Sequence, residues 1–106
     1  MAAKKQTKKT GKFVVVRSYA AGVHVGTLVE SRDSESGRAI VTLKNARRLW
    51  RWRGANSLHE VALRGVAEEY TRLSEAVAEV EVRDVLEVIT ATPEARANLE
   101  RSRWAA

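Results

Sequence analysis

The chain has 106 residues, enough for one compact domain and too few for two. Cysteine is absent, which excludes disulfides and thiolate chemistry, and no apolar run approaches the ~20 residues of a membrane-spanning helix. The net charge is +6, but residues 1–12 and 44–53 each carry +5 without an acid, so the remainder carries −4. We therefore expect a soluble, intracellular protein with one basic arm and one basic stripe.

The N-terminal residues 1–11 predict a flexible arm, and residues 12–106 a single compact domain. The arm has no apolar periodicity, and its like charges repel one another. Two interpretations stay open: a tail that only keeps the protein soluble, or an arm that contacts nucleic acid. The contacts in the second case would come from Lys4, Lys5, Lys8, Lys9 and Lys12.

The first half of the domain predicts three strands. Residues 13–19 are rich in β-branched and aromatic side chains, and residues 23–31 and 38–43 alternate between apolar and polar. A tight turn at 20–22 separates the first two, and Gly26 indicates a bulge or a close backbone approach. These segments predict an antiparallel meander.

The most unusual segment is residues 47–53, which hold four arginines and two of the three tryptophans. Arginine grips phosphate with a planar fork, and tryptophan offers a face for stacking a base or a cation. The segment therefore predicts a ligand with phosphates and flat rings. The competing interpretation is that Trp50 and Trp52 are simply core.

If this segment is a strand, its side chains alternate between two faces. One face would hold Arg48, Trp50 and Trp52, and the other Arg47, Leu49, Arg51 and Arg53.

A helix follows at once, after the break at 54–56. Ser57 as N-cap and Glu60 three residues later form a capping box, and Gly65 ends the helix after Arg64. Free N–H groups and the helix dipole favour anions at such a start. We therefore expect Asn56 and Ser57 to help hold a phosphate delivered by the preceding arginines.

The second half is less regular. The apolar residues of 67–75 fit neither the helical nor the strand period. Residues 76–90 predict a strand with a bulge, or a turn between two strands, near Arg83 and Asp84. Thr92 and Pro93 open a second helix that ends around Trp104. The expected class is α+β: an antiparallel sheet of about five strands with two short helices.

Enzyme signatures are missing: there is no Gly-rich phosphate loop, metalloprotease helix motif or nucleophile elbow. Neither His24 nor His59 has a partner at metal-ligand spacing, so we expect both to have structural or surface roles. We expect no catalysis, no metal and no cofactor.

Two blocks carry a resemblance. VRSYAAGVHVG at 16–26 and NARRLWRWRGANSL at 45–58 resemble the paired pattern VRxYxAGVxxG and ARR[LI]WxWxGAxSL of a family of small phage and prophage proteins. With residues 85–89 and the closing helix, the resemblance covers nearly all of 13–104. This chain departs from the pattern at Arg51, where an aromatic is expected, and at Arg53, often an acid.

That family is in turn similar to the Thoeris anti-defence sponge proteins. Those are oligomers without enzymatic activity that sequester cyclic nucleotide-derived immune signals, such as cyclic ADP-ribose variants, between subunits. The resemblance implies that Arg17 and Arg48 contact phosphate, with Trp50 or Tyr19 as a stacking partner. It also implies a homo-oligomer in the cytoplasm of a bacterial host. The departures leave the ligand open, including nucleic acid.

The leading hypothesis is a phage or prophage protein that sequesters a phosphorylated, cyclic nucleotide-derived signal without turning it over. The alternatives are a nucleic-acid-binding protein and a virion-associated structural protein that docks on a partner chain. The candidate ligand-binding residues are Arg17, Tyr19, Arg47, Arg48, Trp50, Arg51, Trp52, Arg53, Asn56 and Ser57.

Overall fold

The computed structural model describes residues 11–104. Nearly all of the predicted arm, with Lys4, Lys5, Lys8 and Lys9, therefore lies outside the described residues. Lys12 is described: its side chain is exposed, and its carbonyl accepts a hydrogen bond from Leu28 N at 2.8 Å.

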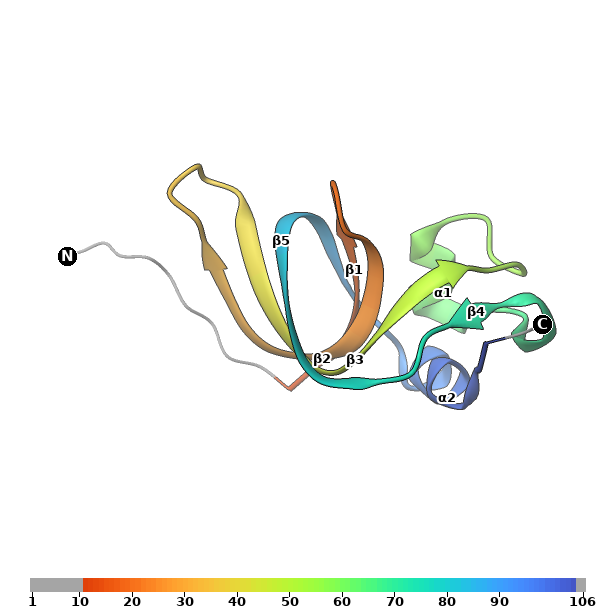
Figure 1. Ribbon diagram of the computed structural model, residues 1–106. Coiled ribbons are helices and arrows are strands. Elements are labelled where there is room, and N and C mark those ends of the chain that lie inside the picture. Colours follow the sequence, from red (N-terminus) through yellow and green to blue (C-terminus); the bar gives the residue numbers. More distant parts are fainter. Residues whose placement is uncertain (1–10, 105–106) are drawn as a thin grey trace.

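Five antiparallel strands form the sheet, in the order β2-β1-β5-β3-β4. β2 also pairs with β3, so β1, β2, β3 and β5 close into a ring (Figure 1). The predicted meander of the first three strands and the α+β class are both confirmed. The strands are β1 (Phe13–Ser18), β2 (Gly22–Asp33), β3 (Ala39–Arg51), β4 (Arg72–Leu73) and β5 (Val77–Thr90).

Two helices lie at the end of the ring where β4 is found, opposite the hairpin between β2 and β3 (Figure 1). They are α1 (Leu58–Arg64) and α2 (Pro93–Arg101), and a short 3-10 turn, η1 (Glu68–Tyr70), lies between α1 and β4. The predicted N-caps are confirmed, because Ser57 Oγ and Thr92 Oγ1 each accept a hydrogen bond from the third helical N–H. α2 ends before the predicted residue, and no helix among residues 11–104 is long and apolar enough to cross a bilayer.

The ring closes because its long strands bend. β5 is one strand with a bulge at Asp84 (φ +53°); its first part pairs with β3 and its second part with β1. β2 bends at Gly26, where a Cβ would lie 3.1 Å from Ala46 Cα. The pairing of β2 with β3 shifts register at the same point, so the glycine is required by the close approach of two backbones.

β1 is buried on both faces, which explains its continuous apolar run. One face lies under the helices and the other points into the ring, so the domain has two cores. The helix-covered core contains Phe13, Val15, Val25, Leu49, Val61, Ala62, Val66, Leu73 and Leu99. The inner core contains Val14, Val16, Leu28, Val41, Leu43, Ala46 and Val82.

Gly65 is expected to be the least replaceable glycine. Its φ is +86°, and a Cβ would lie 2.2 Å from Oδ1 of the buried Asn98, which bonds both backbone groups of Val66. We predict that Gly65→Ala lowers the free energy of unfolding by about 3 kcal/mol or more, since strain and a clash add. Gly37 is the matched control: its φ is +89° with nothing within 4 Å, so Gly37→Ala should cost only about 1–2 kcal/mol in urea titrations. Equal losses would contradict the role of Asn98.

Candidate ligand-binding site

Arg48 and Trp50 form a stacked pair near the end of β3. The Arg48 guanidinium carbon lies 5.2 Å from the centre of the Trp50 ring, and Trp50 is 57% exposed. Gly22 leaves room for this guanidinium, because a Cβ there would lie 3.0 Å from its Nη2. We call the two residues the Arg48–Trp50 pair; it offers a cation and a half-open ring to the same ligand.

The positive charge around this pair is not neutralised by neighbouring acids. Within residues 11–104 no carboxylate forms an ion pair with Arg48, Arg51 or Arg53. All three side chains are exposed, and Arg53 stacks over Tyr70 at 5.6 Å. The surface is therefore suited to anions that also carry rings.

His24 lies beneath this surface. It pairs with Arg48 across β2 and β3 and with Val16 across β1 and β2, so all three point to the inner face. Its Nδ1 is buried without a hydrogen-bond partner in the described part of the chain. Burial, and then the nearby Arg48 charge, lower the pKa of His24 below the usual 6.5, which keeps the ring neutral at pH 7.

Arg17 does not join Arg48. It pairs with Val23, which pairs with Leu49 of the helix-covered core, so Arg17 and Arg48 point to opposite faces of the sheet. The Arg17 side chain forms an ion pair with Glu87 at 3.6 Å. The phosphate site implied by the resemblance is therefore not assembled from these two residues within one chain. Tyr19, in the turn after β1, is 74% exposed.

Arg47 supports the fold. Its Nε donates a hydrogen bond to the carbonyl of Ser74 at 2.7 Å, and its two Nη atoms donate to the carbonyls of Leu99 at 2.8 Å and Ser102. Burial, and then the charge of Arg103, lower the pKa of Arg47 below its ordinary value, although an arginine stays charged. Sequence reasoning placed Arg47 with the ligand contacts, whereas its donors are directed at the end of α2.

Trp52 is separated from Trp50, so the predicted common face for the two rings is wrong. Trp52 is partly buried against the helix-covered core, while Trp50 is exposed. The pairing of β3 with β4 shifts register between Leu49 and Arg51, and β3 ends there, so the strict alternation stops.

The expected anion site at the start of α1 is already filled by the chain. Ser57 Oγ accepts from Glu60 N at 3.3 Å, and the Glu60 carboxylate accepts from Asn56 N at 3.1 Å. That backbone hydrogen bond is the largest of the effects that lower the pKa of Glu60. A carboxylate bound here excludes a phosphate from Asn56 and Ser57.

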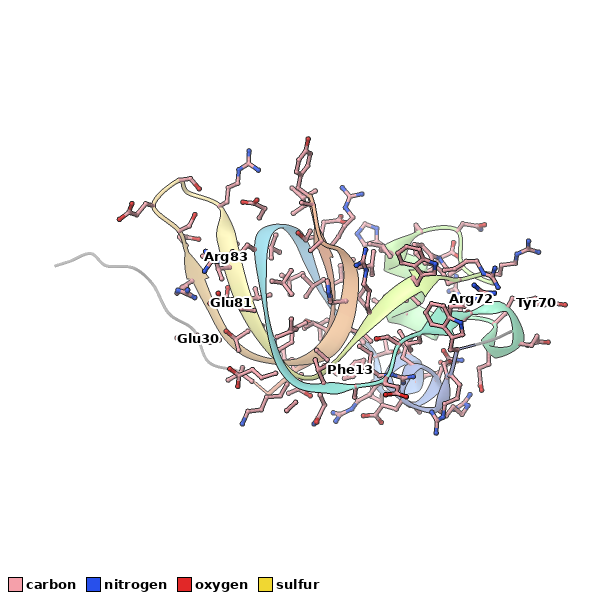
Figure 2. All side chains as sticks on the ribbon, in the orientation of Figure 1. Phe13, Glu30, Tyr70, Arg72, Glu81 and Arg83 are labelled. Carbon is pink, nitrogen blue, oxygen red and sulfur yellow. The ribbon has the colours of Figure 1, made fainter. Side chains whose placement is uncertain are left out.

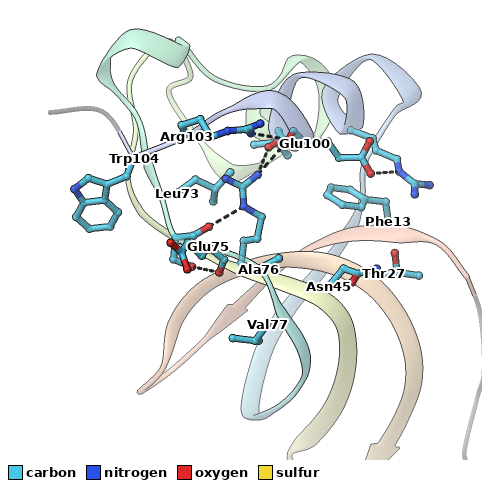
Figure 3. Close-up of a pocket in the computed structure, with 14 residues that line it drawn as sticks. Phe13, Thr27, Asn45, Leu73, Glu75, Ala76, Val77, Glu100, Arg103 and Trp104 are labelled. Carbon is cyan, nitrogen blue, oxygen red and sulfur yellow. Dashed lines mark hydrogen bonds and ion pairs between the residues drawn. The ribbon is translucent and has the colours of Figure 1, made fainter.

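A groove of about 1120 Å³ lies between α2 and the start of β5, and Arg47 is one of the residues that line it (Figure 3). The sequence did not predict this groove, because its lining comes from segments that are far apart in the sequence. Its lining is Phe13, Thr27, Asn45, Arg47, Leu73, Ser74, Glu75, Ala76, Val77, Arg96, Leu99, Glu100, Arg103 and Trp104.

Sequence reasoning also missed Arg72 and Trp104. The Arg72 guanidinium carbon lies 5.2 Å from the centre of the Trp104 ring, which is 51% exposed. Arg72 and Tyr70 lie at the end of the molecule opposite Glu30 and Glu81 (Figure 2). The only available signal was that Trp104 is a tryptophan in a polar terminal segment.

The fold and this surface define a small closed β-ring with two helices, which presents arginines stacked on half-exposed rings. In the described chain, no group of three or more His, Asp or Glu side chains is placed to hold a metal ion. The chain matches the family described as "Domain of unknown function (DUF6948)" over residues 11–99 and belongs to it. No curated protein and no solved structure matches.

Replacing Arg47 should destabilise the fold. We predict that Arg47→Ala lowers the free energy of unfolding by about 2–4 kcal/mol, because it removes the hydrogen bonds to the carbonyls of Ser74, Leu99 and Ser102. Arg51→Ala, an exposed arginine on the same strand, should change it by less than about 0.5 kcal/mol. Denaturant titration measures both; similar values would overturn the role of Arg47.

His24 should make stability depend on pH. Because its pKa is lower in the folded chain, the unfolded chain binds the proton first, and stability falls as pH drops below 6.5. We expect a slope of at most about 1.4 kcal/mol per pH unit between pH 6.5 and 5. His24→Leu should remove this slope, whereas His59→Leu, on the exposed side of α1, should keep it. An unchanged slope in His24→Leu would contradict the assignment.

Proposed function

We propose that this protein binds a phosphorylated, ring-bearing ligand without turning it over, and that the ligand is a cyclic nucleotide-derived signal. The protein would act by sequestering that signal in the cytoplasm of a bacterial host. The observation that carries the proposal is the Arg48–Trp50 pair: a half-open tryptophan ring with a stacked guanidinium that has no acidic partner in residues 11–104.

The chemistry of the pair matches the two parts of a nucleotide. A guanidinium binds phosphate through charge-assisted, bidentate hydrogen bonds. A base stacked on an aromatic side chain contributes about 1–3 kcal/mol, and every base has such a face. Arg51 adds charge from the neighbouring position of β3. Sequestration needs only such binding groups, not proton-transfer groups.

An oligomer follows from the same proposal. If Arg17 and Arg48 both contact phosphate, as the resemblance implies, they must come from different copies, because one chain directs them to opposite faces of the sheet. Tyr19, which is well exposed in the turn after β1, could then stack on the ligand from the second copy. A site between subunits also encloses a ligand that a single open surface cannot.

The arginines provide the test. We predict that one member of a panel of cyclic dinucleotides, cyclic trinucleotides and cyclic ADP-ribose isomers raises the melting temperature, because a ligand that binds only the folded state stabilises it. Replacing Arg48 and Arg51 together by alanine should weaken that binding at least tenfold, as each lost charged contact is worth about 1.5–3 kcal/mol.

The matched control replaces Arg38 and Arg83 by alanine, which removes the same charge from the β2–β3 hairpin and the bend of β5. This variant should bind as the wild type does. Tight binding that survives in the Arg48 and Arg51 double variant would rule out the proposed site.

Single-stranded nucleic acid is the second candidate, favoured by the openness of the surface. Arginine–aromatic stacking recurs beyond the Arg48–Trp50 pair, at Arg53–Tyr70 and at Arg72–Trp104. A series of stacked pairs suits a strand that continues past one nucleotide. A short single-stranded oligonucleotide in the same panel separates the two candidates: if it stabilises the protein in a strongly salt-dependent way while the cyclic compounds do not, nucleic acid is the ligand.

A further inference from the structure

Trp104 lies on the same face of the sheet as Trp50. Leu49 and Leu73 pair across β3 and β4, and both belong to the helix-covered core. The register shift between Leu49 and Arg51 then sets Trp50 and Arg51 together opposite Arg72, on the face away from that core. Arg72 pairs in turn with Trp104 through an isolated antiparallel bridge, and the guanidinium stacks on that indole. Three adjacent extended segments thus present Trp50, Arg72 and Trp104 on one face.

The two indoles are comparable in exposure, with 57% of Trp50 and 51% of Trp104 open to solvent. Each carries a guanidinium 5.2 Å from its ring centre. Stacked arginine on one side of an indole leaves the rest of the ring accessible. Indole area that is half open on two segments of the same sheet face is costly in water unless something covers it.

The order of groups across this face is ring, cation, ring. Neighbouring strands lie about 4.8 Å apart, so the backbones at Arg51, next to Trp50, and at Trp104 are separated by about 10 Å, with Arg72 on the segment between them. Two bases joined through phosphate have the matching order of ring, anion, ring. A single nucleotide would leave one indole uncovered.

We propose that Arg72 and Trp104 form a second stacking position, so that the ligand is of the dinucleotide class, with two bases linked through phosphate. This inference rests on the proposed function and adds to it the number of bases bound. Trp50 holds one base, Trp104 holds the other, and Arg48 and Arg72 face the phosphates between and beside them. Base identity matters little for stacking, since every base has a flat face.

Titrations with AMP and with the linear dinucleotide pApA test the second position in the full-length protein. We expect pApA to bind at least tenfold more tightly than AMP. Trp104→Ala should reduce pApA affinity to that of AMP and change AMP affinity less than twofold. Trp104→Phe should keep most of the advantage, because it keeps a ring, and Trp50→Ala should weaken both probes. Leu63→Ala, at an apolar residue of α1 that is 50% exposed, is the control and should weaken neither.

The outcomes separate the two proposals. If AMP binds through Arg48 but pApA gains nothing, or if Trp104→Ala keeps the gain, the second stacking position is wrong and the proposed function stands. If neither AMP, pApA nor any cyclic nucleotide binds, the proposed function fails and this inference fails with it. Melting curves of each variant without ligand show whether Trp104→Ala keeps the fold; Trp104→Phe covers the case in which it does not.

Discussion

The path of the chain after α2, and with it the position of Trp104, depends on one interaction, the guanidinium of Arg47 with the carbonyls at the end of α2. Carbonyls in the last turn of a helix have few backbone donors and lie at the negative end of the helix dipole, so the half-buried cation of Arg47, with its several fixed donors, stabilises this end of α2. The same guanidinium bonds Ser74, at the start of the chain from β4 to β5. It therefore holds sheet, helix and connection together, and the chain leaving α2 is directed along β4. That path brings Trp104 against Arg72.

β3 has two different roles along its length, and this division explains why the exposed rings lie where they do. Its first part, up to Ala46, pairs with β5 and completes the ring. Its last part pairs with β2 and with the two residues of β4, outside the stretch that pairs with β5. The face that is the buried interior of the ring at Ala46 is therefore open to solvent at Trp50. A strand that leaves a closed sheet must expose one face, and here that face carries the arginines and the indole.

Sequence signals that act over a few residues predicted the helices and turns well. Features that depend on contacts between distant residues could not be predicted from them. The helix boundaries followed from Ser57, Thr92 and Gly65, whose effects act within one helical turn. The role of Arg47 depends on a carbonyl 55 residues away, and the place of Trp52 depends on a register shift set by β4. Neither the partner of Arg47 nor the register shift can be read from the composition of residues 47–53. The sequence thus predicted which segment is unusual, but not which of its side chains face solvent.

The arginines differ in role because they differ in partner. Arg47 is directed at carbonyls and Arg17 at the carboxylate of Glu87, so their charges are already engaged within the chain. Arg48 has a ring beside it, and a ring attracts a cation without cancelling its charge. The acids that give the rest of the domain its negative balance form their ion pairs with arginines elsewhere, as Glu81 does with Arg32. At Arg48, positive charge that no acid of residues 11–104 neutralises therefore lies beside an exposed indole face. A ligand with only phosphates would leave those faces uncovered, and a ligand with only rings would leave the cations unmatched; a nucleotide satisfies both.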